Sequence, residues 1–464
     1  MTEPSQTIFA LSSGTGRAGV AVFRVSGPAA GTSLTALTGS LPPPRVASLR
    51  AVRAPRSSSA PGDLIDHALV IWMPGPASFT GEDSAEIQVH GGAAITRRML
   101  DALGSVPGCR PAEAGEFALR AFENGRIDLA QAEGLADLID AETDAQRRQA
   151  LAQSGGAASR RYADMRKAII DTQALVEAAI DFADEGDVLD QAVNQAELAC
   201  RDLLADIETA LAESARGDLL RDGYQVVLAG PVNAGKSSLL NWFAGHDAAI
   251  VTDEAGTTRD RISVHLELNG YPVVMTDTAG LRETRSKAEA IGVARAREAM
   301  TNAQLVLWLM PPDATAVPTA DTTAALVVED VGAAGADIWC IATKADLAGS
   351  AFATAAEHTA RAADFTVSTV TGIGLDDLRV ALAHQVADKI GDVEAPLVTQ
   401  ARHRAHLDMA RGHVADFLAG DQVTPVELRA EDLRLAAAAI GRITGIIDVE
   451  DVLDSVFARF CIGK

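Results

Sequence analysis

The stretch Gly230-Pro-Val-Asn-Ala-Gly-Lys236-Ser237 decides the fold of the central part of this chain. An apolar run over residues 224–229 comes before it, and the helix-like sequence Ser238-Leu-Leu-Asn-Trp-Phe comes after it. A strand, a glycine loop and a helix start in this order hold a β-phosphate with backbone N–H groups at the positive end of the helix. Lys236 then reaches the β- and γ-phosphates, and Ser237 gives its hydroxyl to Mg²⁺. A chance match to a glycine-rich turn is the alternative, but the flanking strand and helix favour a nucleoside triphosphate.

The composition limits what the remainder of the chain can do. At 464 residues it is too long for one hydrophobic core, and usual domain sizes predict roughly three domains. Its 40 Lys and Arg residues against 63 Asp and Glu residues give a formal charge of −23. Since affinity for nucleic acid comes largely from clustered Lys and Arg, this balance argues against a broad phosphate-binding surface. Any contact with RNA is therefore expected to be local, or shared with a partner.

The cysteines and the apolar runs indicate where the protein works. Four scattered cysteines form neither metal-type pairs nor a disulfide framework, which fits a reducing compartment; they are Cys109, Cys200, Cys340 and Cys461. No apolar run approaches the ~18 residues needed to span a bilayer, and the first residues lack the basic start of a signal peptide. We therefore expect a cytoplasmic protein with no membrane span.

Hydrophobic patterns divide the chain into four predicted segments. Residues 1–118 alternate β-rich runs with turns, as in an α+β domain, and residues 119–216 carry apolar residues at the spacing of a helical bundle. Residues 217–384 alternate strands with helices, which predicts a parallel, doubly wound α/β sheet. Residues 385–464 are helical again, so we expect an α/β P-loop domain inserted into one discontinuous bundle. The expected strands lie at residues 7–11, 19–25, 68–73 and 86–90, and at 225–229, 273–276, 304–310, 338–343 and 365–368.

Two further segments belong to the nucleotide site. Asp277-Thr-Ala-Gly280 ends a predicted strand, where Asp277 can hold Mg²⁺ through water and the N–H of Gly280 can sense the γ-phosphate. Between it and the glycine loop lies Thr252-Asp-Glu-Ala-Gly-Thr-Thr258-Arg-Asp260, in which one threonine, most readily Thr258, completes the Mg²⁺ shell. Alone, such a threonine pair is usually a turn or a cap. Its place in the order of motifs indicates a GTPase-type switch.

The choice of base is predicted at Thr343-Lys344-Ala345-Asp346, where the carboxylate of Asp346 can accept both hydrogens of guanine N1 and N2. The usual motif begins with Asn, whose amide ties neighbouring loops together and donates to the purine. Thr343 is too short to do both, so we expect weaker nucleotide binding. Ser368-Thr-Val then supplies a backbone N–H to guanine O6. The predicted GTP-binding residues are Asn233, Ala234, Gly235, Lys236, Ser237, Ser238, Thr252, Asp253, Glu254, Ala255, Gly256, Thr257, Thr258, Asp277, Thr278, Ala279, Gly280, Thr343, Lys344, Asp346 and Ser368.

Hydrolysis needs a side chain that orients the attacking water, and the position that usually supplies one does not do so in this chain. Leu281 follows Gly280 where a Ras-like enzyme has Gln, and leucine cannot polarise water. Glu289 is the leading substitute, with an exposed helix carboxylate as the alternative reading of that residue. A monovalent cation can also offset charge between the β- and γ-phosphates. Its oxygen ligands are predicted to be Asn233, Thr252, Glu254 and Thr257.

Segments outside the nucleotide site carry a family resemblance together with the GTPase motifs. They are Gly16-Arg-Ala-Gly-Val-Ala-Val-Phe-Arg24-Val-Ser-Gly, Phe79-Thr-Gly-Glu-Asp-Ser-Ala-Glu86, His90-Gly-Gly, Arg110-Pro-Ala-Glu-Ala-Gly-Glu-Phe117, Asp128-Leu-Ala-Gln-Ala-Glu133 and Phe460-Cys461-Ile-Gly-Lys464. Taken in this order, they make the chain resemble the MnmE (TrmE) family of tRNA-modification GTPases from end to end.

The resemblance implies a folate-binding-like N-terminal domain that forms a homodimer and takes 5,10-methylene- or 5-formyl-tetrahydrofolate. Arg24, Glu86 and Lys464 match the folate-contacting positions. Arg126 stands where the family often has Lys, and the two cations are not interchangeable. Without the family, Arg24 would be a surface cation and Glu86 part of the polar face of a sheet.

The resemblance also implies that G domains dimerise across K⁺ and that Glu289 positions the attacking water. Cys461 matches a cysteine near the modification site, although a buried small apolar residue is the alternative. The implied reaction adds a (carboxymethyl)aminomethyl group to C5 of the wobble uridine of certain tRNAs, in a heterotetramer with the FAD-dependent partner MnmG (GidA). GTP hydrolysis would drive G-domain closure.

A GTP-dependent switch in ribosome assembly or signalling is the competing class. Such proteins share the G-domain motifs but usually carry a basic RNA-binding module or a second G domain, and this sequence shows neither. A pure binding role would also leave the N-terminal and C-terminal motifs unexplained.

Overall fold

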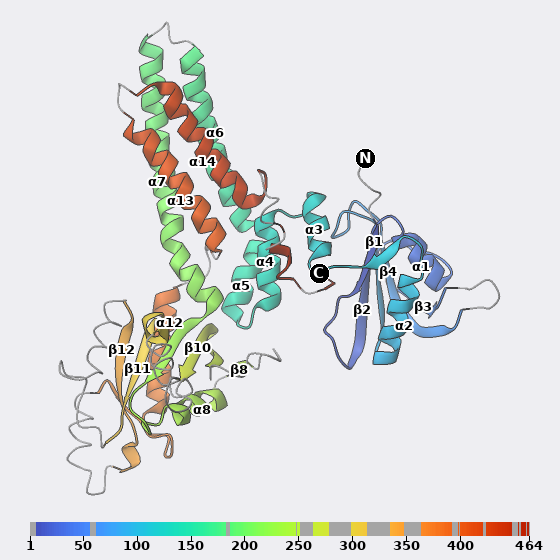
Figure 1. Cartoon of the computed structure of the whole chain (residues 1–464), viewed down its shortest axis with the longest axis horizontal. Helices are drawn as coiled ribbons and strands as arrows, with labels where there is room; N and C mark the ends of the chain where they lie inside the picture. Colours follow the sequence, from blue (N-terminus) through green and yellow to red (C-terminus); the bar gives the residue numbers. More distant parts are fainter. Residues whose placement is uncertain are drawn as a thin grey trace, which may run out of the picture. The chain divides into compact units, whose positions relative to one another are not determined.

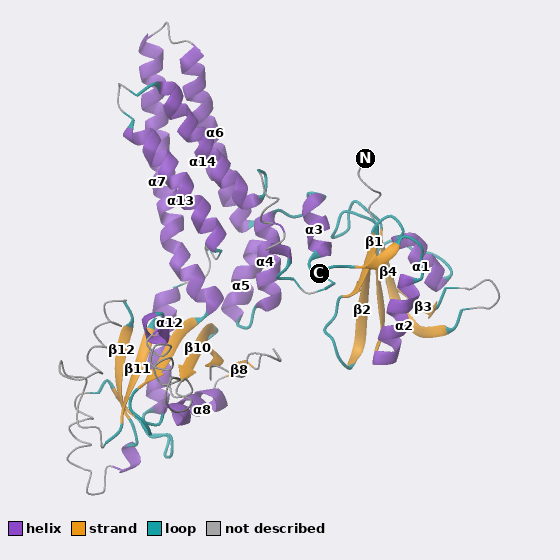
Figure 2. Ribbon diagram, viewed as in Figure 1, coloured by secondary structure: helices purple, strands orange, loops and turns teal. Residues whose placement is uncertain are grey.

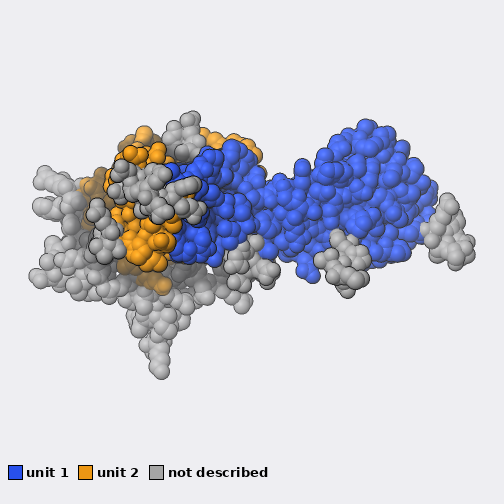
Figure 3. Space-filling model, turned by 90° about the horizontal axis from the view of Figure 1, so that it is seen from above, with its two compact units in different colours: residues 1–136, 153–177, 430–464 blue, residues 137–152, 178–429 orange. Residues whose placement is uncertain are grey.

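The chain forms two compact units in a computed structural model. The described residues are 6–55, 62–181, 186–246, 248–250, 263–277, 298–312, 335–347, 363–391, 398, 400–420, 424–447, 453, 456–460, 462 and 463. The first unit comprises residues 1–136, 153–177 and 430–464, and the second comprises residues 137–152 and 178–429 (Figure 3). The predicted boundaries after residues 118, 216 and 384 fall inside the helices α3 (Glu116–Glu123), α7 (Gly186–Asp222) and α12 (Leu375–Ile390).

The first unit contains a six-stranded sheet in the order β3-β4-β5-β2-β1-β6. Its strands are β1 (Thr7–Leu11), β2 (Ala18–Ser26), β3 (Ser48–Arg53), β4 (Leu64–Met73), β5 (Ser84–Gly91) and β6 (Cys109–Pro111). All neighbours are antiparallel except β1 and β6, which are parallel. The helices α1 (Ala30–Thr38) and α2 (Ala93–Gly104) pack on one face (Figure 1). The four strands predicted in this segment are confirmed, whereas β3 and β6 were not predicted.

Alternating side chains explain which face of this sheet is buried. In β5, Ile87 and Val89 enter the core beneath the helices, while the alternating Glu86, Gln88 and His90 are partly or fully exposed. Glu86 of β5 stands directly opposite Arg24 of β2. On the other side of β1, Ile8 and Ala10 pack against Phe117 of α3. The sheet is therefore a half-buried α+β layer, which agrees with the predicted class.

Helix α4 (Leu129–Asp140) begins where the sequence supplies a cap. Asp128 and Gln131 exchange side-chain to backbone hydrogen bonds of 2.8 and 3.0 Å at its start. This reciprocal capping satisfies free N–H groups of the first turn, so the Asp128–Glu133 motif sets the start of a helix. Helix α6 (Ala157–Asp181) contacts α14 (Val426–Thr444) where Gly441 faces Arg166.

The second unit contains a seven-stranded sheet in the order β13-β12-β11-β7-β10-β9-β8. Its strands are β7 (Tyr224–Ala229), β8 (Ala248–Ile250), β9 (Ser263–Leu268), β10 (Tyr271–Asp277), β11 (Leu305–Met310), β12 (Asp337–Ala342) and β13 (Phe365–Thr366), drawn in orange in Figure 2. The predicted strands are present, although β13 is shorter than expected. The predicted strands pair in parallel, as expected. β8 and β9 were not predicted, and β9 pairs antiparallel with both β8 and β10. Asn269 and Gly270 both have positive φ, as a tight hairpin turn between β9 and β10 requires.

Both faces of this sheet are covered, as a largely parallel sheet requires. Tyr224, Val226 and Leu228 of β7 point into one core with α8 (Lys236–His246) and α12. Val227 and Ala229 point into a second core with Met300 and Ala303. Helix α12 continues to Ile390, six residues past the predicted domain end, because Val386 and Ile390 still belong to the first of these cores.

The long helices divide between the two units. Helix α7, 37 residues long, packs against α13 (Ala401–Ala419) in the second unit, and Arg404 of α13 pairs with Asp218 of α7. Most of α6 and most of α14 belong to the first unit. One discontinuous bundle therefore stays a prediction. Among the helices that the structure describes, none combines the length and apolar composition needed to cross a membrane.

Candidate functional site

The glycine loop joins the carboxyl end of β7 to the first turn of α8. Gly230 has a φ of 136°, and a Cβ at this position would overlap the carbonyl oxygen of Leu309 in β11. Asn233 and Gly235 also have positive φ, 62° and 96°. Only glycine tolerates the conformation and close approach at Gly230. The sequence therefore folds this loop as predicted, with its backbone turned around the amino end of a helix.

Three chemical groups of the predicted site meet at the start of α8. The Nζ of Lys236 donates to the carbonyls of Gly230 and Pro231 at 3.0 and 2.8 Å, and the residue is 7% exposed. The hydroxyl of Ser237 donates to Oδ2 of Asp277 at 2.6 Å. Asp277 is the last residue of β10, which neighbours β7, and it is 1% exposed. A buried ammonium, a hydroxyl and a carboxylate thus lie at one edge of the sheet, where α/β proteins place their ligands.

Thr343 ties the predicted base-binding segment to the glycine loop. It follows β12, is 9% exposed, and its hydroxyl donates to the carbonyl of Ala234 at 2.8 Å. Its N–H bonds the carbonyl of Met310, which ends β11. Thr343 therefore performs one of the two roles of the usual asparagine, because its hydroxyl connects the two loops. The expectation that it cannot also donate to the purine stays a prediction.

Asp346 is held by Ser368. The fully buried Ser368 donates its hydroxyl to Oδ1 of Asp346 at 2.6 Å and accepts the N–H groups of Val370 and Thr371 at 3.3 and 3.2 Å. Lys344, with a φ of 59°, turns the chain into the short 3₁₀ helix Ala345–Leu347 that carries Asp346. The structure brings together the two predicted guanine-contacting segments and fixes the carboxylate between them.

Several predicted residues lie outside the described part of the chain. They are Thr252, Asp253, Glu254, Ala255, Gly256, Thr257, Thr258, Thr278, Ala279, Gly280, Glu289, Cys461 and Lys464. Of the four predicted K⁺ ligands only Asn233 is described, and of the two Mg²⁺ ligands only Ser237. These assignments stay predictions.

A second cluster matches the predicted folate positions on the sheet of the first unit. Arg24 donates to Oε1 of Glu86 at 3.1 Å, and both side chains are about a quarter exposed, at 25% and 22%. The guanidinium lies 5.6 Å from the ring centre of Phe79 and 5.8 Å from that of Phe117. The exposed Arg126 lies beside the loop that contains Phe79, because its Cγ lies beside Gly81. Arg24 is thus a partly exposed cation that is paired with Glu86 and lies near two aromatic rings, and its role in folate binding stays a prediction.

The C-terminal tail lies against this domain. Ser12 donates to the carbonyl of Gly463 at 2.9 Å, and Ile462 forms a β-bridge with Ala114. Gly463 has a φ of 103°, and a Cβ there would overlap the carbonyl oxygen of Leu11. The end of the chain is thus packed close to β1, with a conformation that favours glycine.

A partly buried ion-pair network that no sequence motif singled out connects Arg110, Glu116, Arg120 and Glu82. Glu116 accepts from Arg110 at 2.8 Å and from Arg120 at 3.1 Å, and Arg120 also pairs with Glu82 at 3.1 Å. Burial alone would raise the pKa of Glu116, but hydrogen bonds from Arg110, the Glu113 N–H and Arg120 outweigh it, so the pKa is lowered. The spacing of Glu116 and Arg120, four residues apart at a helix start, was the available signal.

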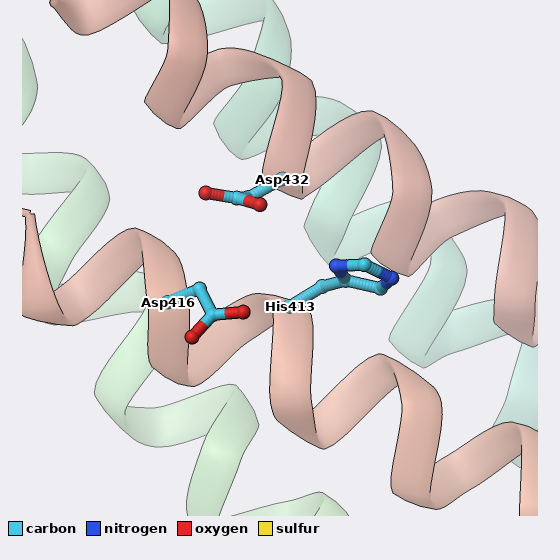
Figure 4. A group of neighbouring side chains, drawn as sticks. All are labelled: His413, Asp416 and Asp432. Carbon is cyan, nitrogen blue, oxygen red and sulfur yellow. The ribbon is translucent and has the colours of Figure 1, made fainter.

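One further polar group sits on the long helices. Figure 4 draws His413 and Asp416, three residues apart on α13, together with Asp432 of α14. Asp432 belongs to the first unit and the other two residues to the second. Because these side chains come from two separate units, no metal site is assigned to them.

Comparisons with known proteins cover the chain almost completely. The family described as the MnmE helical domain matches residues 129–461, and the family described as the N-terminus of the GTP-binding protein TrmE matches residues 7–126. The tRNA modification GTPase MnmE of Methylorubrum populi is 51% identical over 463 residues, covering 99% of this chain and 98% of the relative. That of Rhodopseudomonas palustris is 46% identical over 465 residues and covers 100% of both chains.

Solved structures give weaker likenesses. A variant of Aquifex aeolicus Era bound to GDP·AlF4⁻ is 17% identical, with a TM-score of 0.27, over 44% of this chain and 69% of that chain. The G domain of the T. maritima FeoB iron transporter is 21% identical, with a TM-score of 0.24, over 36% of this chain and 98% of that chain. These scores carry no weight beside the full-length relatives. On the two family matches and those relatives, the chain belongs to the MnmE family of tRNA modification GTPases.

Proposed function

We propose that this protein hydrolyses GTP and that it uses the GTPase cycle in the modification of tRNA. The observation that carries the first half is the meeting of Lys236, Ser237 and Asp277 at one edge of the sheet, with the Asp346–Ser368 pair on neighbouring loops. Cationic, hydroxyl and carboxylate groups in this arrangement suit a nucleoside triphosphate and its Mg²⁺. Family membership supports the second half.

Mg²⁺ fits the residues that are described. It prefers oxygen ligands and keeps several waters, and the Ser237 hydroxyl and Asp277 carboxylate supply two oxygens already in contact. Ser237 would hold the metal directly, together with Thr258, and Asp277 would hold a metal-bound water. The metal would neutralise charge on the β- and γ-phosphates.

Hydrolysis is proposed to depend on K⁺ and on Glu289. K⁺ would lie between paired G domains, bound by Asn233, Thr252, Glu254 and Thr257, and would act where other GTPases use an arginine. Glu289 would position the attacking water, since Leu281 cannot.

The test compares GTP turnover in KCl and NaCl for the wild type and for Glu289→Ala. We expect turnover in KCl only, with GTP binding retained and turnover lost in the variant. Equal turnover in both salts would contradict the cation, and unchanged turnover of Glu289→Ala would contradict the glutamate. Glu298→Ala, an acidic residue at the start of a described helix segment, serves as the matched control.

The N-terminal domain is proposed to bind a one-carbon tetrahydrofolate and to form the homodimer. Arg24 and Glu86 form a partly exposed pair of cation and anion beside Phe79 and Phe117, and the exposed Arg126 lies beside Gly81. Pterin rings offer donors and acceptors to such a pair, and the folate glutamate carries negative charge for Arg126 and Lys464. Binding of 5-formyl-tetrahydrofolate should be lost in Arg24→Ala and kept in Arg17→Ala, whose arginine is exposed in the loop before β2. Equal affinities of both variants would contradict this site.

The full reaction is proposed to be addition of a (carboxymethyl)aminomethyl group to C5 of the wobble uridine, in the cytoplasm and together with the FAD-dependent partner MnmG (GidA). The charge balance supports a shared tRNA site, because 63 acidic residues oppose 40 basic ones. Cys461 is proposed to lie at the modification site.

A further inference from the structure

The hydroxyl of Thr343 has two neighbours that can only accept hydrogen bonds. The carbonyl oxygen of Ala234 lies 2.8 Å away and that of Met310 lies 3.5 Å away. Ala234 is fully buried in the glycine loop, and Thr343 is 9% exposed. The hydrogen bond therefore runs from the base-binding segment to the phosphate-binding loop through the interior of the protein.

A threonine hydroxyl carries one proton, whereas the amide of an asparagine carries two. Since carbonyl oxygens have no proton to give, the Thr343 hydroxyl must donate its single proton to Ala234 or to Met310. None remains for a purine. N7 of guanine is an acceptor without a proton, so it receives nothing from the side chain at position 343.

We propose that Thr343 is a positioning residue that joins the two loops and that, in doing so, makes this site indifferent to the purine N7. The proposal rests on the proposed binding of GTP and adds to it a division of tasks. Asp346, held by Ser368, reads the N1 and N2 edge of guanine. Thr343 holds the loop of Lys236 and Ser237 at a fixed place relative to that carboxylate.

The matched ligand is 7-deaza-GTP, in which a C–H replaces N7 while the N1, N2 and O6 edge is unchanged. The wild-type protein should bind GTP and 7-deaza-GTP with dissociation constants that agree within about twofold. In Thr343→Asn the second amide proton becomes available, and GTP should be preferred about tenfold, as expected for one added hydrogen bond.

Thr343→Val keeps the shape and removes the hydroxyl. It leaves the buried Ala234 carbonyl without its partner, so the affinities for both nucleotides should fall by about tenfold and by the same factor. Thr343→Ser keeps the hydroxyl and should behave as the wild type. If Thr343 had a merely structural role, the Thr343→Asn variant would not change the ratio of the affinities for GTP and 7-deaza-GTP.

Isothermal titration with GTP, 7-deaza-GTP and ATP separates this proposal from the proposed function. Absence of GTP binding, or equal binding of GTP and ATP, would contradict the function itself. Preference of the wild type for GTP over 7-deaza-GTP by about fivefold or more would overturn the present proposal while leaving the function intact. So would a Thr343→Asn variant that does not discriminate, or a Thr343→Val variant that binds both nucleotides as the wild type does.

Discussion

The hydroxyl of Ser368 donates a hydrogen bond of 2.6 Å to Oδ1 of Asp346. Because Ser368 is fully buried and also accepts two backbone N–H groups, its position is fixed by the loop that follows β13. The serine therefore orients the carboxylate that is proposed to select guanine. Its side chain has a role beyond the backbone N–H that the sequence analysis assigned to this loop.

Ser368→Ala should weaken GTP binding about tenfold, since a hydrogen bond to a charged group contributes about 1.5 kcal/mol. Thr371→Ala, which removes an exposed side chain of the same loop, should leave affinity unchanged. Titration with a fluorescent GTP analogue measures both variants. Equal affinities of Ser368→Ala and Thr371→Ala would show that the serine does not hold Asp346.

Asp346→Asn should change the preferred nucleotide from GTP to XTP. Asparagine offers one acceptor and one donor, which suits the N1–H and O2 of xanthine and mismatches the two donors of guanine. GTP turnover should fall about a hundredfold at fixed concentration, and XTP should become the better substrate. If the variant hydrolyses GTP as well as the wild type does, Asp346 is not the guanine partner.

Glu116→Gln should reveal a pH-dependent part of the stability of the N-terminal domain. The pKa of Glu116 lies below its ordinary value of 4.5 in the folded protein. A lowered folded pKa contributes stability above the unfolded pKa, and that stability is lost as the pH falls through the folded value. The protection factors for hydrogen exchange of peptides from residues 6–126, which correct for the intrinsic exchange rate at each pH, should therefore fall in the wild type below about pH 4.5.

In Glu116→Gln the same peptides should already exchange faster at neutral pH, because two arginines lose an ionised partner; breaking such buried pairs costs about 3 kcal/mol. The control is Glu113→Gln, a change at an exposed neighbouring carboxylate, which should keep the wild-type pH profile of hydrogen exchange. Identical pH profiles for all three proteins would show that the Arg110–Glu116–Arg120 network does not stabilise this domain.

Gly463→Ala should displace the C-terminal tail without changing GTP hydrolysis. Its Cβ would overlap the Leu11 carbonyl oxygen, and alanine rarely adopts a φ of 103°. Peptides covering residues 453–464 should lose protection from hydrogen exchange, and tRNA modification should fall. Ile462→Ala, which shortens a side chain that is 63% exposed, should keep both properties. Full modification by Gly463→Ala would show that the docked tail is dispensable.

Local motifs predicted the strands, loop and helix of the candidate nucleotide site because their spacing and flanking elements fix their place. The loop at Gly230 to Ser237 lies between a strand and a helix, and Asp277 ends the neighbouring strand, as predicted. The sequence did not show which hydrogen-bond partner each of these side chains selects. The contact of Thr343 with Ala234 joins residues 109 positions apart, and no local pattern reports it.

The antiparallel hairpin of β9 and β10 was missed although Asn269-Gly270 is a strong turn signal. Alternation of strands with helices predicted the parallel strands, which the structure confirms, but such alternation carries no signal for an added antiparallel hairpin. The predicted domain boundaries stay predictions, although each of them falls inside a helix. Helix α12 continues past residue 384 because its last turns are buried against the sheet, a tertiary contact that periodicity does not show.

The measurement that tests the central claim most directly is mass spectrometry of wobble-uridine nucleosides in tRNA from cells that lack this gene. Wild-type and Lys236→Ala copies are returned separately, with protein levels checked by blot. The C5-aminomethyl nucleosides should disappear with the gene, return with the wild type and stay absent with the variant, whose buried ammonium at the glycine loop is missing. Nucleosides that are unchanged by loss of the gene would contradict a role in tRNA modification, and full restoration by Lys236→Ala would contradict its dependence on GTP.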